Sequence, residues 1–260
     1  MATRNNFRTL RILFLLIVLL FVALSTWLAK VRSTDWDRPL WVVIYPINGD
    51  GSQTSDHYIN ALTIDDFVTI EEFMSREAQR HGLALNEPVT IKLAPPVDEL
   101  PPQPPRNGDI PAVMWWSLKM RYWAYKNDTF DGPAPDIQMF VLYHDPNKFD
   151  HLDHSVGLEK GLLGVVNAFA DSQLNGQNNV VIVHELLHTV GATDKYDLRT
   201  NQPVYPIGYA NPDRQPLFPQ SRAEIMGGRI PVSKVRADIP KNLNETVIGD
   251  ATAVEIQWPE

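Results

Sequence analysis

The stretch His184-Glu185-Leu186-Leu187-His188-Thr189-Val190-Gly191-Ala192-Thr193-Asp194 carries the strongest signal in this chain. On a helix, side chains four positions apart lie on one face, so His184 and His188 can both approach one metal ion. Imidazole nitrogens are common zinc ligands, and a catalytic zinc has three protein ligands and a water molecule. Glu185 lies beside the first ligand, where its carboxylate can accept a proton from that water. The spacing therefore predicts a metal-binding helix.

The third ligand is less clearly defined by the sequence. Gly191 allows a sharp turn after the helix, and the turn can bring Asp194 back to the metal as an oxygen ligand. Asp194 can equally serve the turn itself, because Asp is common there. Glu224 competes for the role, since a distant Glu is the third ligand in thermolysin-like sites, and Asp197 is a further competitor. Two imidazoles and a carboxylate predict one catalytic Zn²⁺ ion.

The alternative to a metal site is a buried helix with two hydrogen-bonded histidines. The apolar residues Val180-Val181-Ile182-Val183 fit a buried helix, although their β-branched side chains also suit a strand. The four-residue spacing of the histidines and the closing glycine favour the helix.

The motif H-E-x-x-H-x-x-G-x-x-D resembles the active-site helix of the metzincin zinc peptidases, whose longer motif ends in His. It is most similar to the snapalysin type, which has Asp in that place. The segment 223–228 resembles the Met-turn of this family, with Met226 as the methionine beneath the metal. Many metzincins have Tyr two residues after this methionine, but this chain has Gly228. A tyrosine acting from that position is therefore excluded.

The resemblance implies a zinc metalloendopeptidase of a protein or peptide substrate. His184, His188 and Asp194 would be the metal ligands, and Glu185 the catalytic general base. The implied fold class is α+β, with a mixed twisted sheet, an active-site helix and an irregular C-terminal subdomain. In this family the strand before the helix pairs with extended substrate at the sheet edge, which here would be Leu163–Phe169.

Hydrophobic patterning predicts the remaining elements. The expected strands are 40–47, 88–94, 137–143 and 162–170, and the expected helices are 64–81, 111–126 and a short one near 248–257. The aromatic side chains of 111–126 are predicted to pack in the core, and the proline-rich stretch 95–105 to form an exposed loop. The loop 144–154 is rich in His and Asp, so a second metal there is left open.

The N-terminus differs in composition from the rest of the chain. Ile12–Ala29 is an 18-residue apolar run preceded by three arginines. This pattern predicts one N-terminal transmembrane helix with a cytoplasmic N-terminus. Residues 1–32 would form a cytoplasmic stub and membrane anchor, and residues 33–260 an extracytoplasmic metallopeptidase domain, either periplasmic or extracellular. The competing interpretation is a cleaved signal peptide, which would give a secreted protein.

Charge and cysteine content limit the possible partners. The chain carries a net charge of −8, has no cysteine, and has five basic and no acidic residues in its first 32 positions. The rest of the chain is therefore strongly acidic, which argues against nucleic acid as a partner. Without disulfides, the domain depends on its core and its metal for stability. The alternative functions are a non-catalytic zinc-containing envelope binding or assembly domain, and a hydrolase that cleaves cell-wall peptides.

Overall fold

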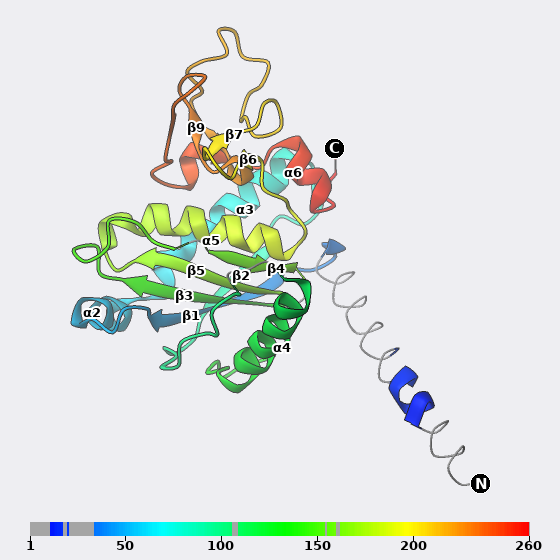
Figure 1. Cartoon of the computed structure of the whole chain (residues 1–260). Coiled ribbons are helices and arrows are strands. Elements are labelled where there is room, and N and C mark those ends of the chain that lie inside the picture. Colours follow the sequence, from blue (N-terminus) through cyan, green and yellow to red (C-terminus); the bar gives the residue numbers. More distant parts are fainter. Residues whose placement is uncertain are drawn as a thin grey trace.

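A five-stranded sheet forms the centre of the computed structural model, which describes residues 11–17, 20, 34–105, 109–153, 155–159 and 162–259 (Figure 1). The strand order is β2-β1-β3-β5-β4. The first four of these strands are parallel, and β4 runs antiparallel to β5. The strands are β1 (Leu40–Asn48), β2 (Val89–Leu93), β3 (Ile137–His144), β4 (Val156–Leu158) and β5 (Leu163–Phe169).

Helices connect and cover these strands. The α-helices of the described residues beyond position 34 are α2 (Gln53–Ala61), α3 (Val68–Arg80), α4 (Ile110–Lys126), α5 (Asn175–Thr189) and α6 (Asp250–Glu255). Short 3₁₀ turns are η1 (Ile64–Phe67), η3 (Ser172–Leu174), η4 (Ile225–Gly227) and η5 (Leu243–Glu245). The C-terminal part adds two-residue strands: β6 (Tyr196–Asp197), β7 (Gln202–Pro203), β8 (Ala223–Glu224), β9 (Ile230–Pro231), β10 (Ala237–Asp238) and β11 (Thr246–Val247).

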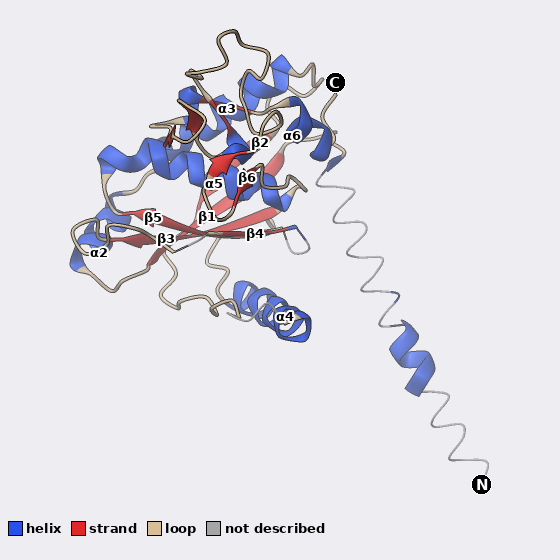
Figure 2. Cartoon of the chain, turned by 45° about the horizontal axis from the view of Figure 1, so that its top comes forward, coloured by secondary structure: helices blue, strands red, loops and turns tan. Residues whose placement is uncertain are grey.

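The parallel strands are buried on both faces because helices cover both sides of the sheet. Alternate residues of β1 enter two separate cores: Val42 and Ile44 pack with α3 and α5, whereas Val43 and Tyr45 pack against α4. Figures 1 and 2 show α4 on the face of the sheet opposite to α5. A strand that is almost entirely apolar, as β1 is from Leu40 to Ile47, is what a sheet covered on both faces requires.

The aromatic helix α4 only partly confirms the prediction of core packing. Met120 and Trp123 are buried against the sheet, and Trp116 is buried with its indole N–H donating to the carbonyl of Pro102. On its other side the helix exposes large apolar side chains, including Tyr122 and Tyr125. The helix is apolar around most of its circumference, but one sheet face can bury only one side of it.

Helix α5, which carries the predicted metal ligands His184 and His188, forms where the sequence predicts it. Ile182 and Val183 in its β-branched segment pack into the core between the helix and the sheet. This burial outweighs the preference of β-branched residues for strands, so the segment is helical. The helix ends at Thr189, and Gly191 has a φ of +109°. A positive φ of this kind favours glycine, so the sharp turn inferred from Gly191 is present.

One prediction about the sheet is wrong. Leu163–Phe169 is β5, and it does not lie at the edge, because β3 pairs with one side of it and β4 with the other. The edge strand beside α5 is β4, a three-residue strand that follows the loop rich in His and Asp. A strand of three residues gives too short an alternating pattern to be recognised in a sequence.

The predicted membrane anchor is also contradicted. Most of its span, residues 12–29, lies outside the described residues, and among the helices that are described none is long and apolar enough to cross a bilayer. This finding overturns the predicted fold class as it was stated, an α+β domain behind a transmembrane helix, together with the membrane-anchored localisation. The described chain is a mixed α/β fold with a five-stranded sheet.

Candidate metal centre

Helix α5 brings three potential metal ligands together. His184, Glu185 and His188 each offer one ligand atom, and these atoms lie within 4.8 Å of one another. The apolar side of α5 packs on the sheet through residues such as Leu187, which leaves the two imidazoles facing the C-terminal part of the chain. This group could hold a metal ion.

The turn after α5 returns Asp194 to the two imidazoles. The Oδ1 atom of Asp194 lies 3.1 Å from Nε2 of His184 and 3.2 Å from Nε2 of His188. The two Nε2 atoms are themselves 3.1 Å apart. The three atoms therefore form a nearly equilateral triangle, as the offset of Asp194 in the sequence predicts.

Backbone carbonyls hold the two imidazole rings in one orientation. Nδ1 of His184 lies 3.0 Å from the carbonyl oxygen of Ile225, and Nδ1 of His188 lies 2.8 Å from that of Ala192. A carbonyl can only accept a hydrogen bond, so each Nδ1 must donate one and carry a proton. In the neutral ring, Nε2 is then left with a free lone pair.

The triangle consists of groups that repel one another unless a positive charge lies among them. Two nitrogen lone pairs and a carboxylate oxygen face one another across about 3 Å. Burial alone would lower the pKa of His184, but its contact with the carboxylate of Asp194 and the charge of Glu185 raise it. Burial opposes ionisation of Asp194, yet its contacts with the two imidazoles lower its pKa well below the usual value. The site therefore favours a cation.

The dimensions of the triangle fit a zinc ion. Four ligands at about 2.0–2.1 Å in a tetrahedron have their atoms roughly 3.3 Å apart, and the three observed separations are close to this value. The ligand chemistry also fits, because imidazole nitrogen and carboxylate oxygen are both common zinc ligands.

Glu185 lies beside the triangle with an unused oxygen. Its side chain is buried, and within the described part of the chain its Oε2 atom has no hydrogen-bond partner. Burial raises the pKa of Glu185 by disfavouring the charged form, while the nearby His184 and His188 act in the opposite direction. A buried carboxylate with a raised pKa and a free oxygen is suited to accepting a proton.

Strand β4 passes directly against this part of α5. A Cβ atom placed on Gly157 would lie 2.5 Å from the carbonyl oxygen of Glu185 and 2.5 Å from Cβ of His188. Only glycine fits at such a distance. The sheet edge therefore runs beside the candidate metal centre.

Tyr196 is a member of the site that sequence reasoning missed. Its ring lies 6.2 Å from that of His184, centroid to centroid. Burial, together with the charges of Asp194 and Glu185, raises the pKa of its phenol to about 12. A Cβ atom on Gly228 would lie 4.0 Å from Cδ1 of Tyr196. Tyr196 therefore lies beside position 228.

The segment resembling a Met-turn is a tight turn against the site. Ile225–Gly227 form η4, which is closed by Gly228 at a φ of +70°. Met226 is fully buried, and its carbonyl accepts a hydrogen bond from the backbone of Lys195, next to Asp194. The turn thereby touches both ends of the motif, since the carbonyl of Ile225 also holds His184.

The two competing carboxylates serve other groups. Glu224 is fully buried and accepts hydrogen bonds from Gly227, Gly249 and Thr252, so its oxygens are directed away from the imidazoles. Asp197 accepts hydrogen bonds from the backbone of the turn that follows it. Of the three carboxylates considered for the third ligand, the structure brings only Asp194 to the histidines.

A second metal in the loop 144–154 finds no support in the described residues, where His184, Glu185 and His188 form the one group able to hold an ion. His144 instead lies 2.9 Å from the amide oxygen of Asn167. His154 lies outside the described residues.

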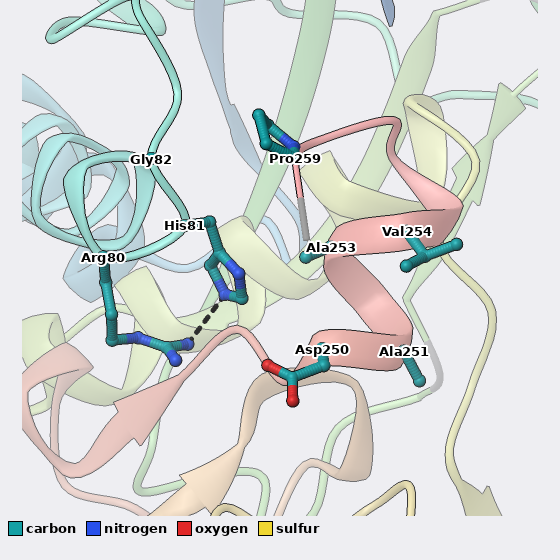
Figure 3. Close-up of a pocket in the computed structure, with 8 residues that line it drawn as sticks. All are labelled: Arg80, His81, Gly82, Asp250, Ala251, Ala253, Val254 and Pro259. Atoms are coloured by element: carbon teal, nitrogen blue, oxygen red, sulfur yellow. Dashed lines mark hydrogen bonds between the residues drawn. The ribbon is translucent and has the colours of Figure 1, made fainter.

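A cavity elsewhere in the domain contains none of these groups. A cavity of about 850 Å³ lies between the end of α3 and α6 (Figure 3). Its lining includes Arg80, His81 and Asp250. The candidate metal centre is therefore not part of this cavity and lies at the edge of the sheet.

Comparison of the sequence with models of known protein families and with curated proteins gives no match.

Proposed function

We propose that this chain is a zinc-dependent peptidase of the metzincin type, in which His184, His188 and Asp194 hold the metal. The observation that carries the proposal is the triangle of two Nε2 atoms and one carboxylate oxygen, with the unpartnered Oε2 of Glu185 beside it. A structural zinc site is closed by four protein ligands and needs no base, whereas here three ligands lie beside a carboxylate of which one oxygen has no hydrogen-bond partner among the described residues.

Zinc bound to these three residues would polarise the carbonyl of the scissile bond and lower the pKa of a water molecule. Glu185 accepts a proton from this water and passes it to the nitrogen of the leaving group. Its burial supports this role. Burial raises the pKa of the carboxylate towards neutral pH, which makes the carboxylate a better proton acceptor. The carbonyls of Ile225 and Ala192 keep the two imidazoles oriented throughout.

Tyr196 supplies the hydrogen-bond donor that Gly228 cannot. Its phenol keeps its proton at neutral pH, since its pKa is raised to about 12. Such a group can donate to the negative charge that develops on the carbonyl oxygen of the substrate. Its phenol is hydrogen-bonded to the carboxylate of Asp194, which places the donor at the edge of the candidate site.

The substrate is an extended peptide that adds to the sheet at β4. This strand is the edge beside α5, and an edge strand offers backbone N–H and C=O groups that a peptide can pair with. Gly157 brings that edge next to Glu185 and His188. Residues 156–158 thus take the substrate-binding role first assigned to Leu163–Phe169.

The test is to compare the purified full chain with its Glu185→Gln variant. We expect both to contain one zinc per chain by elemental analysis, because Glu185 is not a ligand in this proposal. Cleavage of an unfolded protein substrate should fall by about 10²–10⁴-fold in the variant. The exposed carboxylate Glu72 provides a control, and Glu72→Gln should cleave like the parent.

Full activity in Glu185→Gln would rule out the proposed mechanism. A parent protein that binds zinc tightly but cleaves neither unfolded protein nor short peptides would instead favour a non-catalytic zinc-containing binding domain.

A further inference from the structure

We infer that the C-terminal helix α6 positions the third metal ligand, through a clamp in which Glu255 holds Thr193 and Lys195, the residues on either side of Asp194. This inference rests on the proposed function only in taking Asp194 as a ligand. Glu255 and Lys195 are positioning residues, because they act on the metal through Asp194.

A single carboxylate from α6 holds the residue on each side of Asp194. Oε2 of Glu255 accepts a hydrogen bond of 2.8 Å from the backbone N–H of Thr193, and Oε1 accepts one of 2.7 Å from the Thr193 hydroxyl. Oε2 also lies 2.7 Å from Nζ of Lys195. Asp194 is thus held between two residues that are fastened to one side chain.

Lys195 is an unusual residue for this place because only 1% of its surface is exposed. Burying an ammonium group is costly unless it is paired and hydrogen-bonded. Its Nζ donates to the carbonyl of Thr193 at 3.0 Å as well as to Glu255, so both needs are met within the clamp. If Glu255 lost its charge, Lys195 would have to move or leave its buried position.

Other contacts fix α6 itself, which a clamp requires. The buried carboxylate of Glu224 accepts hydrogen bonds from Gly249 and from Thr252 at the start of α6. The same carboxylate accepts the backbone N–H of Gly227 in the Met-turn. Glu224, which the sequence suggests as a metal ligand, therefore ties the turn beneath the site to the helix that holds Asp194.

Helix α3 provides the second support. The carbonyl of Ile248, two residues before α6, lies 2.8 Å from Nε2 of His81 and also accepts a hydrogen bond from Arg80. The backbone N–H of Ile248 donates to the buried Glu77 at 3.0 Å. Figure 3 shows Arg80 and His81 at the end of α3, facing the residues of α6 across the cavity. The start of α6 is thus fixed to the sheet-packed part of the domain.

The test measures metal binding without relying on catalysis. Co²⁺ serves as the probe, its affinity is measured by competition with a chelator, and its visible absorption reports the number of ligands. Glu255→Gln keeps the shape of the side chain but removes its charge. We expect Co²⁺ to bind about 10–100-fold more weakly, the usual consequence of losing a group that orients a metal ligand. Asp250→Asn, which changes an exposed carboxylate of the same helix, should bind Co²⁺ like the parent.

A double-mutant cycle distinguishes positioning from general destabilisation. If Glu255 acts through Asp194, Glu255→Gln should weaken Co²⁺ binding in the parent but by less than about threefold when Asp194 is already Asn. Equal weakening in both backgrounds would overturn the inference. Thr193→Val removes only the hydroxyl contact with Glu255, so it provides a milder variant should Glu255→Gln fail to fold; it should weaken Co²⁺ binding severalfold, and unchanged binding would contradict the clamp.

The outcomes also separate this inference from the proposed function. If Asp194→Asn weakens Co²⁺ binding and Glu255→Gln does not, the clamp is wrong and the peptidase proposal stands. If the full cycle behaves as expected but the parent cleaves no peptide, the clamp stands and the peptidase proposal fails. If Asp194→Asn leaves Co²⁺ binding unchanged, Asp194 is not a ligand and the clamp is wrong.

Discussion

Two histidine nitrogens that both lack a proton face each other at 3.1 Å, because backbone carbonyls require the protons on the opposite nitrogens. This arrangement is unfavourable for neutral rings alone and favourable around a cation. The carboxylate of Asp194 increases the negative potential at the same point. At the scale of single residues, the case for a metal therefore depends on proton positions as much as on residue types.

Tyr196 gives a prediction at this scale. Tyr196→Phe removes one donor from the proposed position of the substrate oxygen and leaves the ring in place. We expect kcat to fall about 10²–10³-fold, the usual effect of losing one donor to a developing oxyanion. KM and zinc content should change little. Steady-state kinetics with a short fluorogenic peptide would measure both constants.

Tyr205→Phe is the matched control, because Tyr205 is 57% exposed and packs against Tyr209. An unchanged kcat in Tyr196→Phe would remove this tyrosine from the mechanism.

The fold brings His184, His188, Glu185 and Asp194 together, and the sequence could suggest this because all four lie within one short segment and local helix geometry fixes most of their spacing. The carbonyls of Ile225 and Ala192 could not be predicted, since a carbonyl has no sequence signature. Tyr196 lies two residues after Asp194, and this closeness was the one available signal. The direction in which the Tyr196 side chain points depends on the turn after α5, and the sequence does not define the conformation of that turn.

At the scale of elements, the decisive contact is between β4 and α5. The three-residue strand lies against the helix at Glu185 and His188, with no space for a side chain at Gly157. Sequence patterning predicted α5 and the longer strands, because each has a hydrophobic pattern of its own. It missed β4, whose existence depends on pairing with β5 rather than on its own composition.

Gly157→Ala should damage the site through this contact. The new Cβ atom would lie 2.5 Å from the carbonyl oxygen of Glu185, so strand or helix must shift. We expect the free energy of unfolding to decrease by about 1–3 kcal/mol, as for other overpacked positions. Zinc affinity should fall as well, because the same Cβ atom would also lie 2.5 Å from Cβ of the metal ligand His188. Urea denaturation and chelator competition would measure the two effects, and a variant with normal zinc affinity would show that β4 can move away freely.

Asp50, in the loop between β1 and α2, gives a pH-dependent prediction. Burial disfavours its charged form, but hydrogen bonds from Ser52, Ser55 and the backbone of Asp145 outweigh this and lower its pKa to about 2. Since the pKa is lower in the folded protein than in the unfolded chain, the contribution of Asp50 to stability is complete above about pH 4 and is lost as the pH falls towards 2.

Asp50→Asn should therefore lower the free energy of unfolding at pH 7 by about 2 kcal/mol. The difference in the free energy of unfolding between the variant and the parent should shrink as the pH falls from about 4 towards 2. Urea denaturation at a series of pH values would show it, with Glu72→Gln as an exposed control. A difference that stays constant down to pH 2 would mean that the charge of Asp50 contributes nothing to stability.

At the scale of the whole molecule, the sheet and its two cores form one body, and the C-terminal part completes the metal centre. Sequence patterning predicted the first part well, because Val42, Ile44 and their neighbours have strong hydrophobic periodicity. Residues 195–249 are built from two-residue strands and turns. Their arrangement depends on buried polar groups such as Glu224 and Lys195, whose partners are distant in the sequence. The pairing of such groups cannot be inferred from one chain alone.

Metal removal should therefore destabilise the whole domain, and not only the site. Zinc would link α5, the Asp194 turn and, through Lys195 and Glu255, the helix α6. At a free zinc concentration 1,000 times the dissociation constant, binding contributes about 4 kcal/mol to the free energy of unfolding. For a domain of this size, a chelator should then lower Tm by about 10 °C. In a variant with both His184→Ala and His188→Ala, the chelator should leave Tm unchanged, because the linkage disappears with the ligands. An equal shift in that variant would show that the stabilising metal binds elsewhere.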